Sequence, residues 1–318
     1  MAIKSERLGP LREAVSPKQV ARAIGASESS LKRWCDNGLL ETTRTGGGHR
    51  RIPIDAVLRF VKERGHSLVD PEVIGLPPST GAGAKTLDRG REALLAALQD
   101  ANQTAALRTL LDLYLGGNAM TQVFDEVITS VLHEVGELWA SGDMEVYEER
   151  RGVEFIGETL YEFGRLLPSS GEGWPRAMGG TLDTDPYTLA PRMVDLTLRG
   201  AGFASDYLGC NLPFGTFDTA IERERPDLFW LSVSALDDES RFVRGANDLF
   251  NRCEMLGVMF AIGGRALVPD IRRRIKYHAF CDTTAHLEAA AKSLRERMLE
   301  RQEQIGGGEE NGDAPLSF

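Results

Sequence analysis

The stretch "GGTLDTDPYTLAPRMVDLTLRGAG", Gly179–Gly202, decides the fold class of the second half of the chain. A short apolar run, typical of a buried strand, meets Asp185-Pro186, and an amphipathic helical pattern follows. We predict that Asp185 is the N-cap of this helix and that Pro186 is its first residue. The stretch therefore indicates one strand–loop–helix unit of an α/β domain.

The same alternation continues over residues 175–302. The predicted strands are 177–182, 203–208, 228–233 and 258–262, with a weaker fifth near 279–281. The predicted helices are 187–200, 215–224, 240–256, 265–275 and 284–302. Because alternating strands and helices form a parallel sheet covered on both faces, we predict a flavodoxin-like (Rossmann-type) domain. Ligands of such sheets bind beyond the carboxyl ends of the strands, and the loops there are 184–190, 209–215, 232–238 and 263–266.

Charge is distributed unevenly along the chain. The formal net charge is −10, yet residues 1–66 hold 13 Lys/Arg against 7 Asp/Glu. A basic module on an acidic body favours local contact with a polyanion. No apolar run reaches the roughly 20 residues of a membrane span, the N-terminus lacks the apolar core of a signal peptide, and the four cysteines form no CxxC pair. We expect a cytoplasmic, nucleoid-associated protein with no membrane partner and no metal site.

Residues 1–66 contain two short helices with clear boundaries. Ser16 and Gln19 form a capping box at the start of the first helix, and Gly25 ends it. Ser27 caps the second helix, which runs to about Asp36. Two helices joined by a tight turn form a helix-turn-helix, whose second helix can enter the major groove of DNA.

A glycine turn follows, flanked by strand-like runs at 39–44 and 49–52. This pattern predicts a hairpin wing, followed by a third helix that Asp55 caps and that runs through Val61. Basic side chains of a wing bind phosphates, and these contacts supply most of the affinity for DNA. The candidate DNA-binding residues are Ser29, Ser30, Lys32, Arg33, Arg44, His49, Arg50 and Arg51.

The segments "SESSLKRWCDNGLL" and "RTGGGHRRI" resemble the winged helix-turn-helix of MerR-type regulators. The resemblance implies binding of double-stranded operator DNA by a symmetric dimer or tetramer, because one head covers one half-site. Excisionase-like proteins share this module, and a small helical module that binds protein is a further alternative.

Residues 67–85 are rich in proline, glycine and small polar residues and predict a flexible linker. Residues 86–168 predict a four-helix bundle, with helices at 87–101, 103–115, 119–139 and 143–167. Glu149 falls on the apolar stripe of the last helix, where a carboxylate is costly unless it is paired or faces a polar ligand. Alternatively, Glu149 lies at a partly solvated edge of the stripe, and Trp139 is then a simple core residue.

Residues 303–318 are acidic and glycine-rich and predict a disordered tail.

The second half of the chain resembles a cobalamin-binding domain, whose pattern is Asp-x-His-x-x-Gly, Leu-Gly, Ser and Gly-Gly after four successive strands. The corresponding residues here are Asp185-Pro-Tyr187-Thr-Leu-Ala190, Leu208-Gly209, Ser232 and Gly263-Gly264. "GELWASGDMEVYEERR" resembles the Trp-x9-Glu-His motif of the helical cap of such a domain, with Trp139 and Glu149 matching and Arg150 in place of histidine. The whole chain resembles the CarH-like branch of the MerR family, light-sensing repressors that use adenosylcobalamin.

The departures from this pattern fall on the chemistry. The resemblance places the lower cobalt ligand at Tyr187, and a phenol is mostly protonated at pH 7 and a poor donor. It places the residue that orients that ligand at Asp185, and the histidine that caps cobalt after photolysis at Arg150. Ala190 adds a methyl group where glycine lets the nucleotide tail approach. We therefore expect no resident cofactor, with adenosylcobalamin held by atypical ligation as the alternative.

The candidate ligand-binding cleft comprises Trp139, Glu149, Arg150, Asp185, Tyr187, Ala190, Ser232, Gly263 and Gly264. For Ser232 and the two glycines, tight turns are as good an explanation as ligand contact. We expect a non-enzymatic, multi-domain α and α/β regulator, controlled by a protein partner or constitutive assembly, by another small molecule in the cleft, or by cobalamin. The rival from another class is a corrinoid carrier for a methyltransferase.

Overall fold

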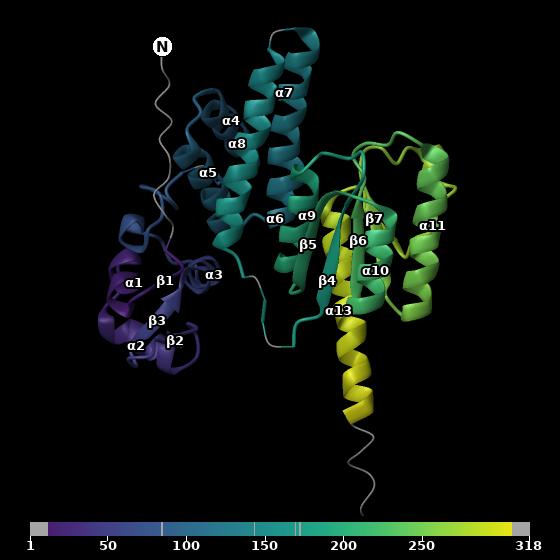
Figure 1. Cartoon of the computed structure of the whole chain (residues 1–318). Helices are drawn as coiled ribbons and strands as arrows, with labels where there is room; N and C mark the ends of the chain where they lie inside the picture. The colour runs from purple at the N-terminus through teal and green to yellow at the C-terminus, as the bar shows by residue number, and fades with distance from the viewer. Residues whose placement is uncertain (1–11, 84, 143, 169, 172, 307–318) are drawn as a thin grey trace, which may run out of the picture. The chain divides into compact units, whose positions relative to one another are not determined.

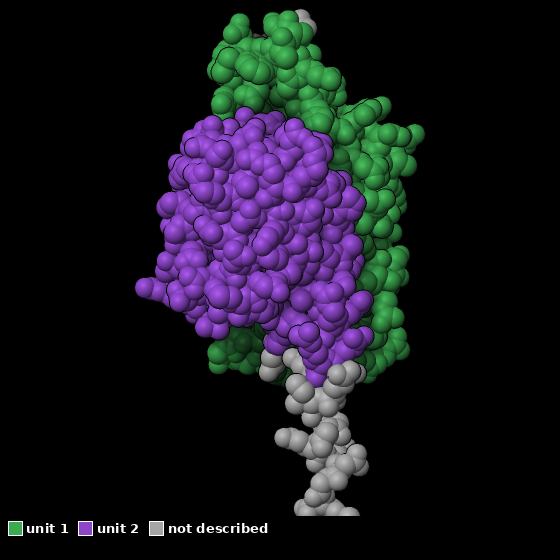
Figure 2. Space-filling view, turned by 90° about the vertical axis from the view of Figure 1, so that its right-hand side faces the viewer, with its two compact units in different colours: residues 1–169 green, residues 170–318 purple. Residues whose placement is uncertain are grey.

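A computed structural model describes residues 12–83, 85–142, 144–168, 170–171 and 173–306, with side chains described up to residue 301. The chain divides into two compact units, Met1–Ser169 and Ser170–Phe318, which Figure 2 colours separately. Among the described helices, none combines the length and the apolar composition that crossing a membrane requires.

The first unit begins with a winged module, which we call the head (residues 12–65). Its helices are α1 (Pro17–Ala23), α2 (Glu28–Asp36) and α3 (Ile54–Arg64). Its strands are β1 (Ala14–Val15), β2 (Thr43–Arg44) and β3 (Arg50–Pro53), antiparallel in the order β1-β3-β2 (Figure 1). The predicted capping box is confirmed, because Ser16 Oγ accepts from Gln19 N and the Gln19 side chain accepts from Ser16 N.

The head differs from the sequence predictions in two places, one strand that was not predicted and one cap that was wrong. Strand β1 was not predicted, because two residues carry no periodic signal and the strand exists only through its pairing with β3. Asp55 does not cap α3: Pro53 holds the N-cap position without a side-chain bond, and the Asp55 carboxylate instead lies 3.5 Å from Arg59 Nη2.

The helical bundle follows, with the predicted third helix broken into three parts. Its elements are α4 (Leu87–Gln99), α5 (Gln103–Leu115), α6 (Met120–Gln122), the π-helical segment η2 (Val123–Ile128), α7 (Thr129–Ser141) and α8 (Val146–Arg165). The hydroxyl of Thr129 donates to Phe124 O, five residues back, at 2.9 Å. Apolar spacing alone does not distinguish this wider turn from an α-helix, since its residues Val123, Phe124, Val127 and Ile128 are buried in the same bundle core.

The segment 67–85 is not the flexible linker that its composition predicted. The 3-10 helix η1 (Pro71–Ile74) packs on α1, and Ile74, Leu76 and Thr80 are buried. The prediction from composition was wrong because a few buried apolar residues are enough to order the segment. Residue 84 lies outside the described residues.

The second unit is a five-stranded parallel sheet in the order β5-β4-β6-β7-β8, and the predicted fold class is confirmed (Figure 1). The strands are β4 (Arg176–Leu182), β5 (Ala204–Leu212), β6 (Leu228–Ser232), β7 (Met259–Gly263) and β8 (Ala279–Phe280). The helices are α9 (Leu189–Gly200), α10 (Phe214–Glu224), α11 (Glu239–Leu256), α12 (Pro269–Arg272) and α13 (Thr284–Gly306).

Both faces of this sheet are buried, as a parallel sheet requires. Phe229 and Phe260 belong to the core under α10 and α11, whereas Trp230 and Ala261 belong to the core under α9 and α13. Adjacent residues of β6 and β7 thus fill opposite cores, which explains why these strands are continuous apolar runs in the sequence.

Some predicted boundaries in this unit were wrong. The helix expected at 265–275 is only α12, because the residues before Pro269 form a tight turn after β7. Residues 303–306 of the expected disordered tail belong to α13, and residues 307–318 lie outside the described residues. Asp185 is not an N-cap: α9 begins at Leu189 after Thr188, and the aspartate is used by a non-local contact described below.

Replacing Ser16 with Ala should lower the free energy of unfolding of the head by about 1 kcal/mol, because it leaves an amide of the first turn of α1 without an acceptor. Thermal denaturation followed by circular dichroism measures this loss. Thr86→Ala is the matched control, since Thr86 holds the N-cap position of α4 without a side-chain bond. Equal losses in both variants would contradict a stabilising role for the capping box.

Candidate functional site

The exposed face of α2 carries basic and small polar side chains. Leu31 and Cys35 are buried, whereas Ser29, Lys32 and Arg33 are exposed. Because residues three and four apart share one side of a helix, these three lie on a common face. Ser30, half-buried, donates its amide to the N-cap hydroxyl of Ser27 at 3.1 Å, so it belongs to the cap of the helix.

The wing places its basic residues next to α2. Arg44 pairs directly with Arg50 across the β2–β3 hairpin, and like charges in that position repel each other. The repulsion is relieved on one side, because Arg50 donates through both Nη atoms to Asp36 Oδ1 at 3.0 Å. Arg50 therefore fastens the wing to the end of α2. Arg51 pairs with Thr43, and His49 is exposed at the turn.

At the carboxyl edge of the parallel sheet, Asp185 connects two loops. Its side chain is fully buried; Oδ1 accepts from Tyr187 N at 3.2 Å and Oδ2 accepts from Ser234 N at 2.6 Å. Burial raises the pKa of this carboxyl group, and the amides of Ser234, Tyr187 and Ala235 oppose that rise. The loop after β4 is thereby tied to the loop after β6.

Tyr187 follows this connection and lies under an arginine from a third loop. The guanidinium carbon of Arg265 is 4.5 Å from the centre of the Tyr187 ring, a cation–π arrangement. Nε of Arg265 also donates to Ser234 O at 3.2 Å, so the arginine joins all three loops. Sequence reasoning missed Arg265 and Ser234; the only signal for Arg265 was its place directly after the Gly-Gly pair.

The two glycines of the candidate cleft have structural reasons to be glycine. A Cβ on Gly263 would collide with Cys281 O, and a Cβ on Gly264 would collide with the backbone of Val233. Gly264 also has φ of +131°, a conformation that side chains disfavour. Ser232 is buried at the end of β6, and Ala190 is half-buried in the first turn of α9. For both glycines, turn geometry is a sufficient explanation.

The remaining candidate residues lie in the first unit, on the α7–α8 hairpin. Trp139 is 50% exposed and so is not a core residue of the described structure. The Glu149 side chain is 25% exposed, and Arg150 Nε lies 3.6 Å from its Oε2. Glu149 is therefore paired by its neighbour in sequence, which is one of the two conditions under which a carboxylate is tolerated on an apolar stripe.

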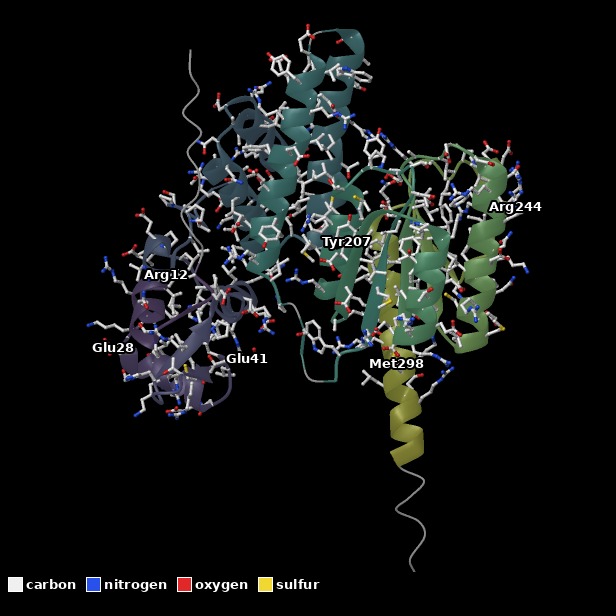
Figure 3. The ribbon with its side chains drawn as sticks, in the orientation of Figure 1. Arg12, Glu28, Glu41, Tyr207, Arg244 and Met298 are labelled. Carbon is white, nitrogen blue, oxygen red and sulfur yellow. The ribbon has the colours of Figure 1, made fainter. Side chains whose placement is uncertain are left out.

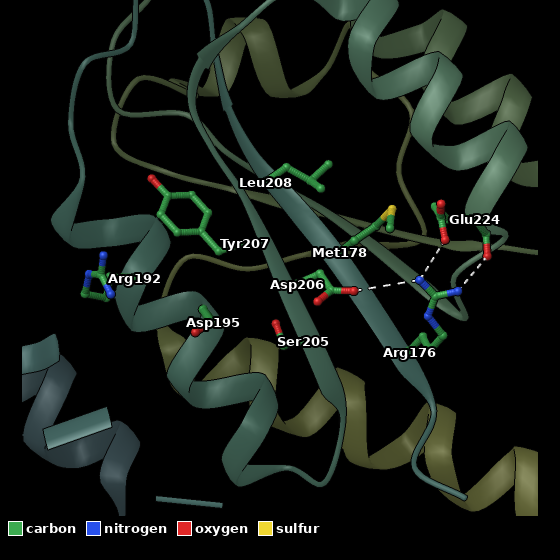
Figure 4. Close-up of a pocket in the computed structure, with 9 residues that line it drawn as sticks. All are labelled: Arg176, Met178, Arg192, Asp195, Ser205, Asp206, Tyr207, Leu208 and Glu224. Carbon is green, nitrogen blue, oxygen red and sulfur yellow. Dashed lines mark hydrogen bonds and ion pairs between the residues drawn. The ribbon is translucent and has the colours of Figure 1, made fainter. Parts of the chain in front are cut away.

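A hollow that sequence reasoning did not find lies beside the first half of the edge strand β5 (Figure 4). Its volume is about 530 Å³, and Arg176 at its rim pairs with Asp206 and Glu224 at 3.7 and 3.0 Å. Burial raises the pKa of Tyr207 to about 12; the residue is labelled in Figure 3. No group of three or more His, Cys, Asp or Glu side chains in the described part of the chain could hold a metal ion.

Comparison with known protein families finds two matches, both within the first unit. Residues 14–65 match the family described as a helix-turn-helix domain, and residues 91–156 match the B12 binding domain family. The chain thus joins a helix-turn-helix domain to a B12-binding domain. Along most of its length it is homologous to the HTH-type transcriptional repressor CarH of Myxococcus xanthus, with 28% identity over 270 residues, 77% of this chain and 87% of that protein.

A solved structure shares the fold of about two thirds of the chain. The monomethylamine corrinoid protein of Methanosarcina barkeri matches with a TM-score of 0.53 and 14% identity, covering 66% of this chain and 100% of that chain. At this identity the match shows the fold alone.

Replacing Gly264 with Ala should lower the free energy of unfolding by about 2–4 kcal/mol, because the added carbon meets the Val233 backbone at a positive φ. Urea denaturation measures the change. Gly215→Ala is the control, since no atom lies within 4 Å of its added carbon. Wild-type stability of Gly264→Ala would show that this glycine has a role other than turn geometry.

Proposed function

We propose that this protein is a DNA-binding transcriptional regulator of the MerR type that acts in the cytoplasm as a symmetric oligomer. The observation that carries the proposal is the common exposed face of Ser29, Lys32 and Arg33 beside a basic wing, on a head that matches a helix-turn-helix family. The net charge of −10 makes this local basic surface stand out against the acidic remainder. Homology to a repressor supports the same conclusion.

The residues of the head divide by task. Lys32 and Arg33 project from the recognition helix and are assigned to base edges and adjacent phosphates of the major groove. Arg44, His49 and Arg51 are assigned to phosphates flanking the groove. Arg50, fastened to Asp36, acts chiefly by holding the wing in position. Ser29 and Ser30 lie at the amino end of α2, where amides and the helix dipole favour a phosphate.

A histidine-ligated corrin does not fit the carboxyl edge of the sheet. Tyr187 presents a phenol instead of an imidazole, and Arg265 lies against one face of its ring, although the residue is 40% exposed. Both oxygens of Asp185, which would orient such a ligand, already accept loop amides. Arg150 is a permanent cation and cannot donate a lone pair to cobalt. The domain therefore serves assembly, or senses something other than histidine-ligated cobalamin.

Two alternatives follow from the comparisons. The match to the B12 binding domain family supports an adenosylcobalamin-dependent repressor that lacks the usual ligand. A corrinoid carrier for a methyltransferase has the same bundle and sheet. The basic head argues against the carrier, because carrying a methyl group requires no DNA-binding surface, and we therefore propose no enzymatic activity.

Replacing Arg51 with Ala should weaken DNA binding and lower the slope of log affinity against log salt by about one, as expected for one lost phosphate contact. Lys32→Ala or Arg33→Ala should cost roughly 1–3 kcal/mol on the preferred sequence if a base contact is lost. Fluorescence anisotropy with duplexes selected from a random pool, titrated at several salt concentrations, measures both effects.

The control for these variants is Arg244→Ala, which removes the same charge from exposed α11 in the second unit (Figure 3). It should bind DNA like the wild type. No salt-dependent binding of any duplex by the wild type, or equal losses in Arg51→Ala and Arg244→Ala, would reject the proposed DNA-binding face.

Protein mixed with adenosylcobalamin in darkness and then desalted should show no corrin absorption, because the edge offers no imidazole donor. Combining Tyr187→His, Ala190→Gly and Arg265→Ala should increase uptake, since these changes supply a donor and uncover it; Tyr187→Phe with Ala190→Gly and Arg265→Ala is the control without a donor. A coloured, light-sensitive wild-type protein would reject the cofactor-free proposal. No uptake by the His variant would reject these three residues as the obstacle.

A further inference from the structure

The segment Leu68–Gly83, which we call the strap, is fastened to the head along its first half. The amides of Val69 and Asp70 both donate to Ala23 O, at 2.7 and 3.1 Å. Val73 O accepts from Arg12 Nη1 and from Gln19 Nε2, at 3.3 and 3.2 Å. These bonds fix the strap to the carboxyl end of α1 and to the residues that precede β1, where Figure 3 labels Arg12.

Apolar burial reinforces the same half. Ile74 is 0% exposed and Leu76 is 4% exposed, so both are withdrawn from water as completely as core residues. Burial of such side chains stabilises the ordered strap and opposes the loss of chain entropy. A tether that merely spans two domains would not bury its apolar side chains.

The second half of the strap is fastened to the bundle by a buried carboxylate. Asp112 of α5 is 3% exposed, and its Oδ1 accepts from Gly81 N at 2.5 Å. The amide of Gly83 also bonds to this carboxylate, and burial raises its pKa while both amides oppose the rise. A Cβ on Gly83 would collide with Asp112 Oδ2, so only glycine allows this approach.

A third connection joins the head to the bundle directly. Nζ of Lys62, in the last turn of α3, donates to Asn118 O at 3.1 Å and lies 3.9 Å from the centre of the Tyr114 ring. The ammonium group thus contacts a carbonyl oxygen of the loop after α5 and the aromatic ring of a residue of α5. This contact is independent of the strap, and it opposes rotation of the head about it.

We propose that the strap and the Lys62 contact clamp the head to the bundle as one body, so that the bundle fixes the direction in which α2 meets DNA. The clamp itself does not depend on the proposed DNA-binding function, whereas its consequence for operator spacing rests on that function. In a two-fold assembly, clamped heads hold their recognition helices at one separation and so select one spacing between operator half-sites. Tethered heads would accept several spacings.

The clamp is tested without DNA by NMR relaxation of the full-length chain. In the wild type, head and bundle amides should relax at the same transverse rate, because they tumble together. Gly83→Ala combined with Lys62→Ala should make the head amides relax severalfold more slowly than the bundle amides, since a small module then moves on its own. Gly136→Ala is the control, because its added carbon meets no atom within 4 Å.

Hydrogen exchange gives a second readout that does not depend on how the head tumbles. Amides of the strap should be protected in the wild type and in Gly136→Ala, and should exchange at least tenfold faster in Gly83→Ala, with bundle amides unchanged. Unprotected strap amides in the wild type, independent relaxation of its head, or clamped behaviour in the double variant would each overturn the proposal.

The consequence for DNA is measured with duplexes that carry two selected half-sites at increasing separations. The wild type should prefer one separation at least tenfold, and the double variant should lose this preference while binding a single half-site unchanged. Equal preference in both proteins would overturn the role of the clamp in DNA recognition. Failure of the wild type to bind any duplex would instead reject the proposed function, while relaxation and exchange would still decide whether the clamp exists.

Discussion

The buried carboxylate of Asp185 is the constraint on which the carboxyl edge of the sheet depends. A buried charge is costly unless hydrogen bonds replace its hydration, and here loop amides supply them. Because Ser234 N is held by Asp185, Ser234 O is in place to accept from Arg265, which in turn covers Tyr187. One satisfied carboxylate thus connects three loops, and Asp185 and Arg265 have protein partners before any ligand is considered.

The first unit uses the same device a second time. Asp112 is buried on a helix and accepts amides of Gly81 and Gly83, just as Asp185 is buried after a strand and accepts amides of the neighbouring loop. In both places a buried carboxylate holds a segment that lies outside helices and strands. Order in the strap and at the sheet edge therefore depends on single side chains, which makes both regions sensitive to single substitutions.

Features with local causes could be predicted from the sequence. Features that depend on contacts between residues far apart in the chain could not. Capping by Ser16, the glycine turn of the wing and the apolar runs of β4, β6 and β7 depend on neighbours in the chain or on periodic burial. Asp185 followed by proline has the local signature of a helix start, but its carboxylate bonds to an amide 49 residues away. The prediction of a flexible linker at residues 67–85 was wrong for the same reason. The segment is rich in proline and glycine, yet Ile74 and Leu76 are buried in contacts that no local pattern indicates.

For the candidate site, motif matching indicated Tyr187 as the residue in the ligand position, but it did not indicate that Arg265 lies against its ring. The loss of one donor does not by itself close a cofactor site, since other groups could ligate cobalt. What gives the substitution its force is Arg265, because a guanidinium 4.5 Å from the centre of the ring adds a positive charge beside the only group here that stands in the ligand position. Asp185 attracts this cation, which opposes the rise that burial causes in the pKa of the carboxyl group, but both of its oxygens already accept loop amides. A corrin at this edge would therefore compete with contacts that the three loops already make with one another.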